Sequence, residues 1–194
     1  MNHLAHFKVA HPDPGLMVGG FLGDFVKGRL TGDYPHEVER GIRLHRAVDA
    51  FVDSHPVARH SVQRFVPPYR RFAPILVDVI YDHYLAELWA SYHDEAIQRF
   101  CDAVFEALSG HASLLPTRAR TIAERMMASR SMEQYYRDDF VAGSFRSLAG
   151  RLKRDNPMAE AFTEFDRLRT ELREDFVRFF PDLMAFTENW QQEN

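Results

Sequence analysis

Residues 74–89, PILVDVIYDHYLAELW, are predicted to form a helix that begins at a proline and is apolar on nearly every side. Two carboxylates, Asp78 and Asp82, and the imidazole of His83 interrupt the apolar run. Side chains four residues apart lie about 40° apart around a helix axis, so the two carboxylates share a face. A helix that is apolar all round belongs in a core, where carboxylates are costly unless they are paired, hydrogen-bonded or bound to a metal. The stretch therefore predicts a core helix whose acids have partners elsewhere in the chain.

The rest of the chain shows the helical spacing of apolar residues and no strand-like alternation. A second strong helix is predicted over residues 36–54, where Pro56 stops it. The other predicted helices cover residues 16–30, 57–64, 74–92, 94–109 and 116–128, one or two within 132–153, and 157–180, with a short terminal helix after Pro181. Residues 1–10 are expected to form a short segment before a turn. With 194 residues, 45% of them hydrophobic, the pattern predicts one compact all-α domain over residues 1–194.

Charge and composition exclude several classes of protein. The net charge of −4 gives no support for nucleic acid as a partner, and no apolar run approaches the roughly 18 residues of a membrane span. The first residues lack the apolar centre of a signal peptide. The single cysteine, Cys101, allows no internal disulfide, which is typical of a reducing compartment. We therefore expect a cytoplasmic protein without nucleic-acid or membrane partners, with the oligomeric state left open.

Imidazoles and carboxylates gather on the predicted helices. His45 and Asp49 lie four residues apart on the helix predicted over residues 36–54, and Asp53 follows four residues later on the same face. Asp24 on the preceding helix and His6 upstream add one more of each type. Neutral imidazole nitrogens and carboxylate oxygens are ligands of divalent metal ions. Each residue taken alone is more simply a structural hydrogen-bond or salt-bridge partner, and only their coincidence on several helices favours a metal site.

Arginines accompany this candidate site. Arg43 and Arg46 carry guanidinium groups that can bind phosphate oxygens in pairs. They belong to residues 27–71, where nine lysines and arginines are concentrated. The remaining histidines in loops or at helix ends, His3 among them, are expected to be ordinary surface residues.

Five groups of residues, taken in order and with their spacing, resemble the motifs of a known family. They are Met1, Asn2, Leu4, Ala5 and His6; Gly23, Asp24, Phe25, Val26, Lys27 and Gly28; Gly41, Ile42, Leu44, His45, Arg46, Val48, Asp49, Asp53 and Pro56; Arg71, Ala73, Pro74, Ile75, Asp78, Val79, Asp82 and His83; and Phe179 with Pro181. The chain resembles the acyl carrier protein phosphodiesterases, a family similar to a divergent branch of the HD phosphohydrolases. The motifs extend from the first residue almost to the last.

The resemblance implies an HD-like, metal-dependent enzyme that uses Mn²⁺ or Mg²⁺. The implied reaction is hydrolysis of the phosphodiester that joins 4′-phosphopantetheine to a serine of holo-acyl carrier protein, which gives the apo-carrier protein. The implied metal-binding positions are Asp24, His6, His45, Asp49, Asp78, Asp82 and His83. The implied catalytic residues are Asp24, His45 and Arg46. The implied substrate-binding residues, which would face an acidic carrier protein, are Arg43, Arg46, Lys27, Arg70 and Arg71.

Two other functions stay open at this point. The first is an HD-like hydrolase of a small phosphoester such as a nucleotide, which would share the metal site but need no protein-docking surface. The second is a catalytically inactive helical binding module.

Overall fold

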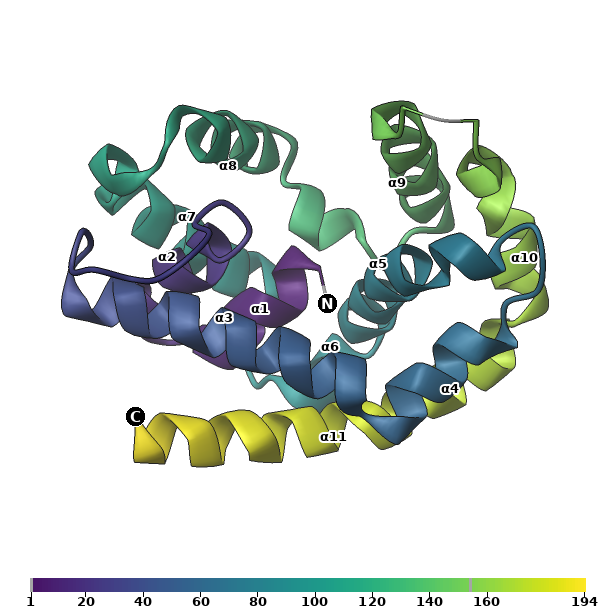
Figure 1. Ribbon diagram of the computed structural model, residues 1–194, viewed down its shortest axis with the longest axis horizontal. Helices are drawn as coiled ribbons and strands as arrows, with labels where there is room; N and C mark the ends of the chain where they lie inside the picture. Colours follow the sequence, from purple (N-terminus) through teal and green to yellow (C-terminus); the bar gives the residue numbers. More distant parts are fainter. Residues whose placement is uncertain (1, 154) are drawn as a thin grey trace.

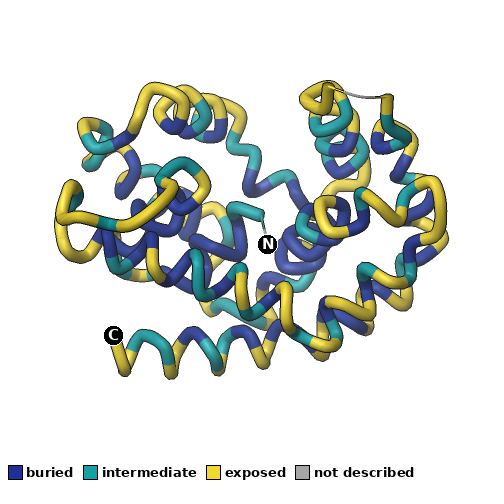
Figure 2. The backbone as a smooth tube through the Cα atoms, viewed as in Figure 1, coloured by how far each residue is buried: buried dark blue, intermediate teal, exposed yellow. Residues whose placement is uncertain are grey.

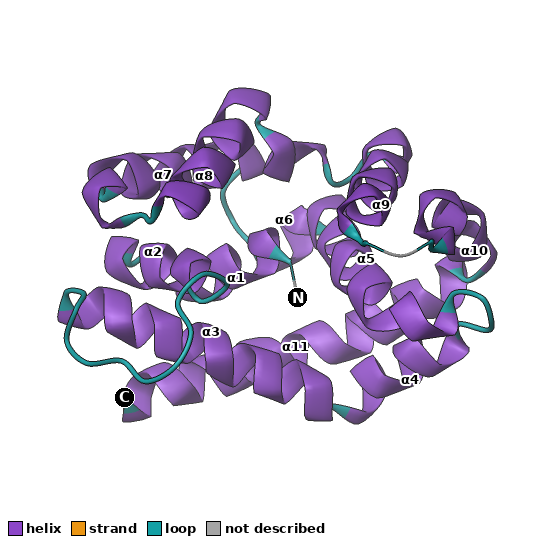
Figure 3. Ribbon diagram, turned by 45° about the horizontal axis from the view of Figure 1, so that its top comes forward, coloured by secondary structure: helices purple, strands orange, loops and turns teal. Residues whose placement is uncertain are grey.

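The computed structural model describes residues 2–153 and 155–194, and all regular secondary structure in them is helical (Figure 3). The α-helices are α1 His3–Ala10, α2 Pro14–Leu22, α3 His36–Ser54, α4 Pro56–Arg64, α5 Ala73–Glu87, α6 Trp89–Tyr92, α7 Ile97–Gly110, α8 Thr117–Ser129, α9 Asp138–Arg151, α10 Ala161–Arg167 and α11 Arg169–Glu193. The short 3₁₀ helices are η1 Arg70–Phe72, η2 Ala112–Leu114, η3 Ser131–Gln134 and η4 Pro157–Glu160. The all-α prediction is confirmed, and the relation to the HD fold stays a prediction.

Helix α5 is the buried centre of the structure, as the sequence predicts. It carries Pro74 in its first turn, where the missing N–H is not needed, and 11 of its 15 residues are buried. Helices α1, α4, α9 and α11 all pack against it, and Figure 2 shows it as a largely buried helix. The predicted extension to residue 92 is wrong in one respect. Leu88 leaves the helical conformation at φ −99° and ψ 18°, so that α6 is a separate short helix.

Asp82 of α5 is paired with the first turn of α1. Its carboxylate accepts hydrogen bonds from the backbone N–H of Leu4 at 2.8 Å and of Ala5 at 3.3 Å. The first N–H groups of a helix have no partner within the helix, and the positive end of the helix dipole favours an anion. Asn2 stands in the capping position, but its side chain makes no capping hydrogen bond. A residue distant in sequence therefore caps α1, inside the core.

Replacing Asp82 tests this capping role. We expect Asp82→Ala to lower the free energy of unfolding by about 2–4 kcal/mol, because two buried N–H groups lose their acceptor. Asp82→Asn keeps an acceptor oxygen and should cost clearly less. Urea denaturation followed by circular dichroism measures both. Equal stability of the two variants, together with lost metal binding, would instead indicate a ligand role.

Two glycines bring α2 and α3 into backbone contact. A Cβ atom on Gly19 would lie 2.1 Å from the carbonyl oxygen of Val38, and one on Gly41 would lie 2.4 Å from that of Leu16. No side chain fits at either position, because real Cβ atoms do not approach so closely. The close crossing holds the end of α2 beside the middle of α3, where the candidate site lies.

The helix predicted over residues 16–30 is shorter than expected. Helix α2 ends at Leu22, and the chain then turns away. A Cβ on Gly23 would lie 2.2 Å from Cγ of His45, so the imidazole of α3 occupies the space beside this residue. Asp24 consequently lies in the turn after the helix and not on an apolar helical face.

The C-terminal helices also differ from the prediction. The single helix expected over residues 157–180 is interrupted at Leu168, and α11 continues through Pro181, where a stop was expected. A proline inside a helix costs about 3 kcal/mol. Phe176 and Phe180 before the proline and Leu183 after it are all buried, so packing maintains one continuous helix. Helix α11 runs along α3 and α4 (Figure 1).

Candidate functional site

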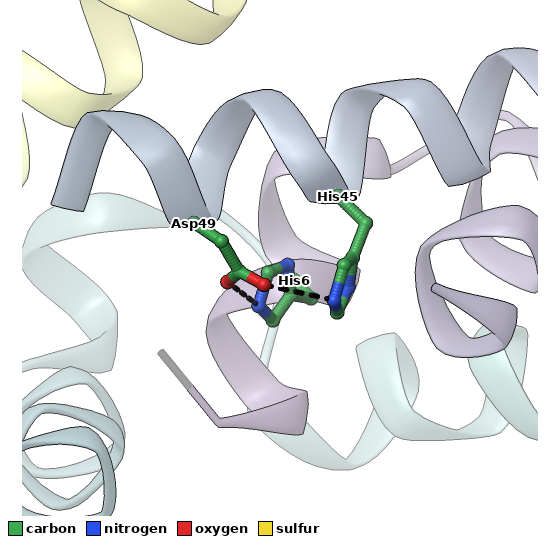
Figure 4. Close-up of side chains that lie close together, drawn as sticks. All are labelled: His6, His45 and Asp49. Carbon is green, nitrogen blue, oxygen red and sulfur yellow. Dashed lines mark ion pairs between the residues drawn. The ribbon is translucent and has the colours of Figure 1, made fainter. Parts of the chain in front are cut away.

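His6, His45 and Asp49 form a group whose nitrogen and oxygen atoms lie within 4.8 Å of one another. His6 comes from α1, and the other two come from successive turns of α3 (Figure 4). The distance from Nε2 of His6 to Oδ1 of Asp49 is 3.3 Å, and that from Nε2 of His45 to Oδ2 of Asp49 is 3.1 Å. The two imidazole rings stack with their centroids 4.0 Å apart. The helical spacing thus places His45 and Asp49 together, and the packing of α1 on α3 adds His6.

His6 is buried, and neither of its ring nitrogens has a hydrogen-bond partner among the described residues. Its contact with Asp49 has the length of an ion pair but not the direction of a hydrogen bond. Buried polar atoms without partners are unfavourable and rare in folded proteins. A divalent ion bound to an imidazole nitrogen would remove this penalty, so the group is chemically suited to hold a metal.

The electrostatics of the group favour the protonation states that metal ligands need. Burial lowers the pKa of His6 to about 4, although the neighbouring carboxylate of Asp49 acts in the opposite direction. Burial alone would raise the pKa of Asp49, but the imidazoles of His45 and His6 outweigh it and hold that pKa far below its usual range. Near pH 7, the group therefore offers a neutral imidazole at His6 and an ionised carboxylate.

The pKa of His6 predicts how stability depends on pH. In the unfolded chain His6 takes up a proton near pH 6.5, whereas the folded protein resists protonation down to about pH 4. The free energy of unfolding therefore falls as the pH drops through this window, by at most about 3 kcal/mol from this residue. In EDTA, His6→Gln should lose less stability than the wild type between pH 7 and pH 4.5 in urea titrations. If the stability of the wild type and of His6→Gln fell equally with pH, the lowered pKa would not belong to His6.

Asp24 and His3 extend the group toward solvent. Asp24 is about half exposed, with Oδ1 at 3.8 Å from Nε2 of His45 and Oδ2 at 3.8 Å from Nδ1 of His3. His3 was expected to be an ordinary surface residue, but it is only partly exposed beside Asp24, and burial lowers its pKa. The signal available in the sequence was the three-residue spacing of His3 and His6, which places them on one side of a helix.

A cavity of about 430 Å³ lies beside the group, and we call it the acidic cavity. Asp24 and Asp49 line it together with Asp53 and Asp78, and burial raises the pKa of Asp78. Its apolar wall comes from α3, α4 and α5: Val52, Ala58, Val62, Pro74 and Val77. Arg59 and Gln63 of α4 also line the cavity, although the sequence analysis did not select them. Their four-residue spacing on a short helix was the available signal.

The structure does not bring Asp82 and His83 into the group of His6, His45 and Asp49, which we call the metal-binding group for the ion that it is suited to hold. Asp82 caps α1. The Nδ1 atom of His83 lies 2.8 Å from the carbonyl oxygen of Tyr135, and Nε2 lies 3.3 Å from a carboxylate oxygen of Glu87. The ring of His83 also packs edge-on against Phe165. Both side chains have structural partners, and their ligand role stays a prediction.

The predicted substrate-binding residues do not line the acidic cavity. Arg46 is partly buried and donates a hydrogen bond of 3.0 Å to the carbonyl oxygen of Val26, which ties the turn after α2 to α3. Arg43 is exposed, with Nη1 at 3.6 Å from Glu39. Lys27, Arg70 and Arg71 are exposed.

Together, the fold and the site define a class of all-helical protein with a group able to hold a metal ion at the edge of an acidic cavity. Within that class, the chain belongs to the acyl carrier protein phosphodiesterase family, whose model matches residues 1–183. This membership confirms the resemblance inferred from the motifs.

Curated relatives agree with the family over nearly the whole chain. The acyl carrier protein phosphodiesterase of Klebsiella pneumoniae (strain 342) is 31% identical over 98% of this chain and 100% of its own length. That of Enterobacter sp. (strain 638) is 32% identical over the same shares, and that of Serratia proteamaculans (strain 568) is 31% identical over 95% and 96%. Comparison with solved structures finds no match. Among the described residues, no helix is long and apolar enough to cross a membrane.

Proposed function

We propose that this protein is a cytoplasmic, metal-dependent phosphodiesterase that removes 4′-phosphopantetheine from the serine of holo-acyl carrier protein and leaves the apo-carrier protein. Family membership and the shared name of full-length relatives support the reaction. The observation that carries the proposal is structural: two imidazoles and a carboxylate converge beside a cavity lined by further carboxylates. A single domain over residues 1–194 would supply the whole activity.

His6, His45 and Asp49 would hold the ion, which we take to be Mn²⁺ or Mg²⁺. Nitrogen and oxygen donors in one group are compatible with either ion, and the buried nitrogens of His6, which have no hydrogen-bond partner among the described residues, support a ligand there. When bound, a divalent ion offsets charge on a phosphoryl group and makes a neighbouring water more acidic. Asp24, Asp53 and Asp78 line the same cavity and provide further oxygen donors.

The residues of the chain have separable roles in the proposed hydrolysis. A new bond forms between the water oxygen and phosphorus, and the bond from phosphorus to the serine oxygen breaks. Asp24, which lies 3.8 Å from both His3 and His45, is placed to accept the proton that the water loses and to return it to the departing serine oxygen. Arg59, which lines the cavity, can neutralise charge on the phosphoryl oxygens. Arg59 is the arginine among the residues that line the acidic cavity, and the catalytic role of Arg46, which donates a hydrogen bond to Val26, stays a prediction.

Metal binding can be tested without substrate. We expect saturating Mn²⁺ to raise the melting temperature of the protein by roughly 5 °C, because an ion that binds only the folded state stabilises it. His6→Gln, His45→Gln and Asp49→Asn should each abolish the shift. His83→Gln, which replaces a buried histidine outside the group, is the matched control and should keep it. If only His83→Gln abolished the shift, the ion would instead be assigned to a site on α5.

The reaction itself is tested by intact-mass spectrometry of holo-acyl carrier protein incubated with the enzyme and Mn²⁺. We expect the carrier protein to lose the mass of the phosphopantetheine group, and EDTA to prevent the loss. Asp24→Ala should slow the reaction by about 100-fold or more, because it removes a group at the reacting centre. No loss of mass with any divalent ion would reject the carrier protein as substrate and favour the small-phosphoester alternative.

Docking of the carrier protein on a basic surface distinguishes the proposed function from hydrolysis of a small phosphoester. Arg70 and Arg71 are exposed beside the start of α5, and an acidic carrier protein would be attracted to them. We expect the double reversal Arg70→Glu and Arg71→Glu to raise KM for the carrier protein by roughly tenfold at low salt, with a smaller effect at high salt. Arg99→Glu, an exposed reversal on α7, is the control. An unchanged KM would show that these two arginines take no part in docking the carrier protein.

A further inference from the structure

A second cavity, of about 590 Å³, lies between α8 and α9 and reaches the first turn of α1. We call it the neutral cavity, because uncharged side chains make up most of its wall. Its apolar residues are Val79, Ile122, Met126, Phe140 and Leu148. Its uncharged polar residues are Asn2, Ser129, Ser131, Gln134, Tyr135, Ser144 and Ser147. In Figure 1, α8 and α9 lie apart at the upper edge of the molecule.

The linings of the two cavities approach each other at His3 and Asp24, and we call this contact the junction. His3 lines the neutral cavity, and its Nδ1 lies 3.8 Å from the carboxylate of Asp24. Asp24 lines the acidic cavity and lies 3.8 Å from His45. A molecule with its phosphorus at this junction could therefore extend into both cavities.

Such an arrangement suits a phosphodiester. The phosphorus of a diester carries two organic groups that leave it in different directions, whereas a monoester carries one. In the proposed reaction these groups are the serine of the carrier protein and the pantetheine arm. The arm is a long chain with two amides, a hydroxyl, methyl and methylene groups and a terminal thiol, and it has no charge at neutral pH.

The two cavities differ in the chemistry that they offer to this arm. The acidic cavity has an apolar wall, Arg59 and Gln63, but it also presents four carboxylates, Asp24, Asp49, Asp53 and Asp78, which suit cations and repel the carbonyl oxygens of amides. The neutral cavity alternates apolar surface with hydroxyl and amide groups, which can contact methylene groups and hydrogen-bond amides. Its volume lies in the usual range for binding a small organic molecule.

The charged residues of the neutral cavity are compatible with an arm that has its phosphate at the junction. Arg151 lines the cavity and carries a cationic charge at the last turn of α9. Arg137 is already paired with Asp139, with contacts at 2.6 and 3.0 Å. Arg125, Arg137 and Arg151 are all exposed and therefore stand at the rim.

We propose that the neutral cavity binds the pantetheine arm of the substrate, with the phosphate end of the arm at His3 and Asp24. This inference rests on the proposed function and adds the position of the arm. The carrier protein would then lie on the other side of the phosphorus from the pantetheine arm.

Photo-crosslinking locates the arm directly. The probe is 4′-phosphopantetheine alkylated on its thiol with a diazirine group, irradiated with the wild-type protein and digested for peptide mass spectrometry. We expect crosslinks in peptides covering residues 122–148. Crosslinks in residues 52–63, which border the acidic cavity, would overturn the proposal. Crosslinks in any other part of the chain, or no crosslinks above background, would also overturn it.

Two glycines of α9 allow a matched pair of variants. Gly143 lines the neutral cavity and Gly150 does not, and an added Cβ has room at both positions. We expect Gly143→Trp to lower kcat/KM for holo-acyl carrier protein by roughly tenfold or more, because the ring occupies the space of the arm. Gly150→Trp should keep the wild-type value, and both variants should keep the Mn²⁺-dependent rise in melting temperature. Ser147→Trp, an exposed position that also lines the cavity, replaces Gly143→Trp if that variant does not fold.

The outcomes distinguish this inference from the proposed function. A wild-type protein that releases no phosphopantetheine from the carrier protein refutes the function and, with it, the placement of the arm. A wild-type protein that releases it, with equal kcat/KM in the Gly143 and Gly150 variants, overturns only the placement.

Discussion

The hydrogen bonds between Asp82 and the first turn of α1 are the contact on which the site depends most. Helix α1 has eight residues and would not be stable alone. The N–H groups of Leu4 and Ala5 in its first turn are satisfied inside the core by a carboxylate of α5, a helix with 11 of its 15 residues buried. This contact fixes the direction of α1, and the direction of α1 places His3 and His6 beside α3.

A second constraint positions the other half of the site. Gly19 and Gly41 let α2 and α3 touch through their backbones, and Gly23 lets the ring of His45 lie against the chain that leads to Asp24. These contacts tolerate no side chain, so the positions of Asp24 and His45 are tightly linked. The metal-binding group is therefore built by two packing constraints, one that holds α1 and one that holds α2 against α3.

Periodicity in the sequence was sufficient to predict the elements that depend on local spacing. The helix predicted over residues 36–54 has the bounds of α3, and the shared face of His45 and Asp49 follows from a four-residue interval. The helix of residues 74–89 was correctly placed in the core, because an almost wholly apolar helix has no other stable environment. The proximity of His6 to these residues could be suspected only from the motifs, since it depends on the packing of α1.

Features decided by tertiary contacts could not be predicted from local sequence. The ring of His45 leaves no room for a side chain at Gly23, where α2 has ended, and the continuation of α11 through Pro181 depends on the buried aromatic residues around it. A buried acid such as Asp82 needs a partner, and the structure shows one at the first turn of α1, while the ligand role implied by the family resemblance stays a prediction. The sequence alone showed that such a partner was required but not which one it was.

The capping of α1 by a residue 78 positions away also has a consequence for the order of assembly during synthesis. All three residues of the metal-binding group lie within the first 49 residues, but the carboxylate that anchors α1 belongs to residue 82. A growing chain would therefore carry the complete set of ligands before it could hold them in place. If the group holds an ion as proposed, tight binding would have to wait until α5 has left the ribosome and packed against α1.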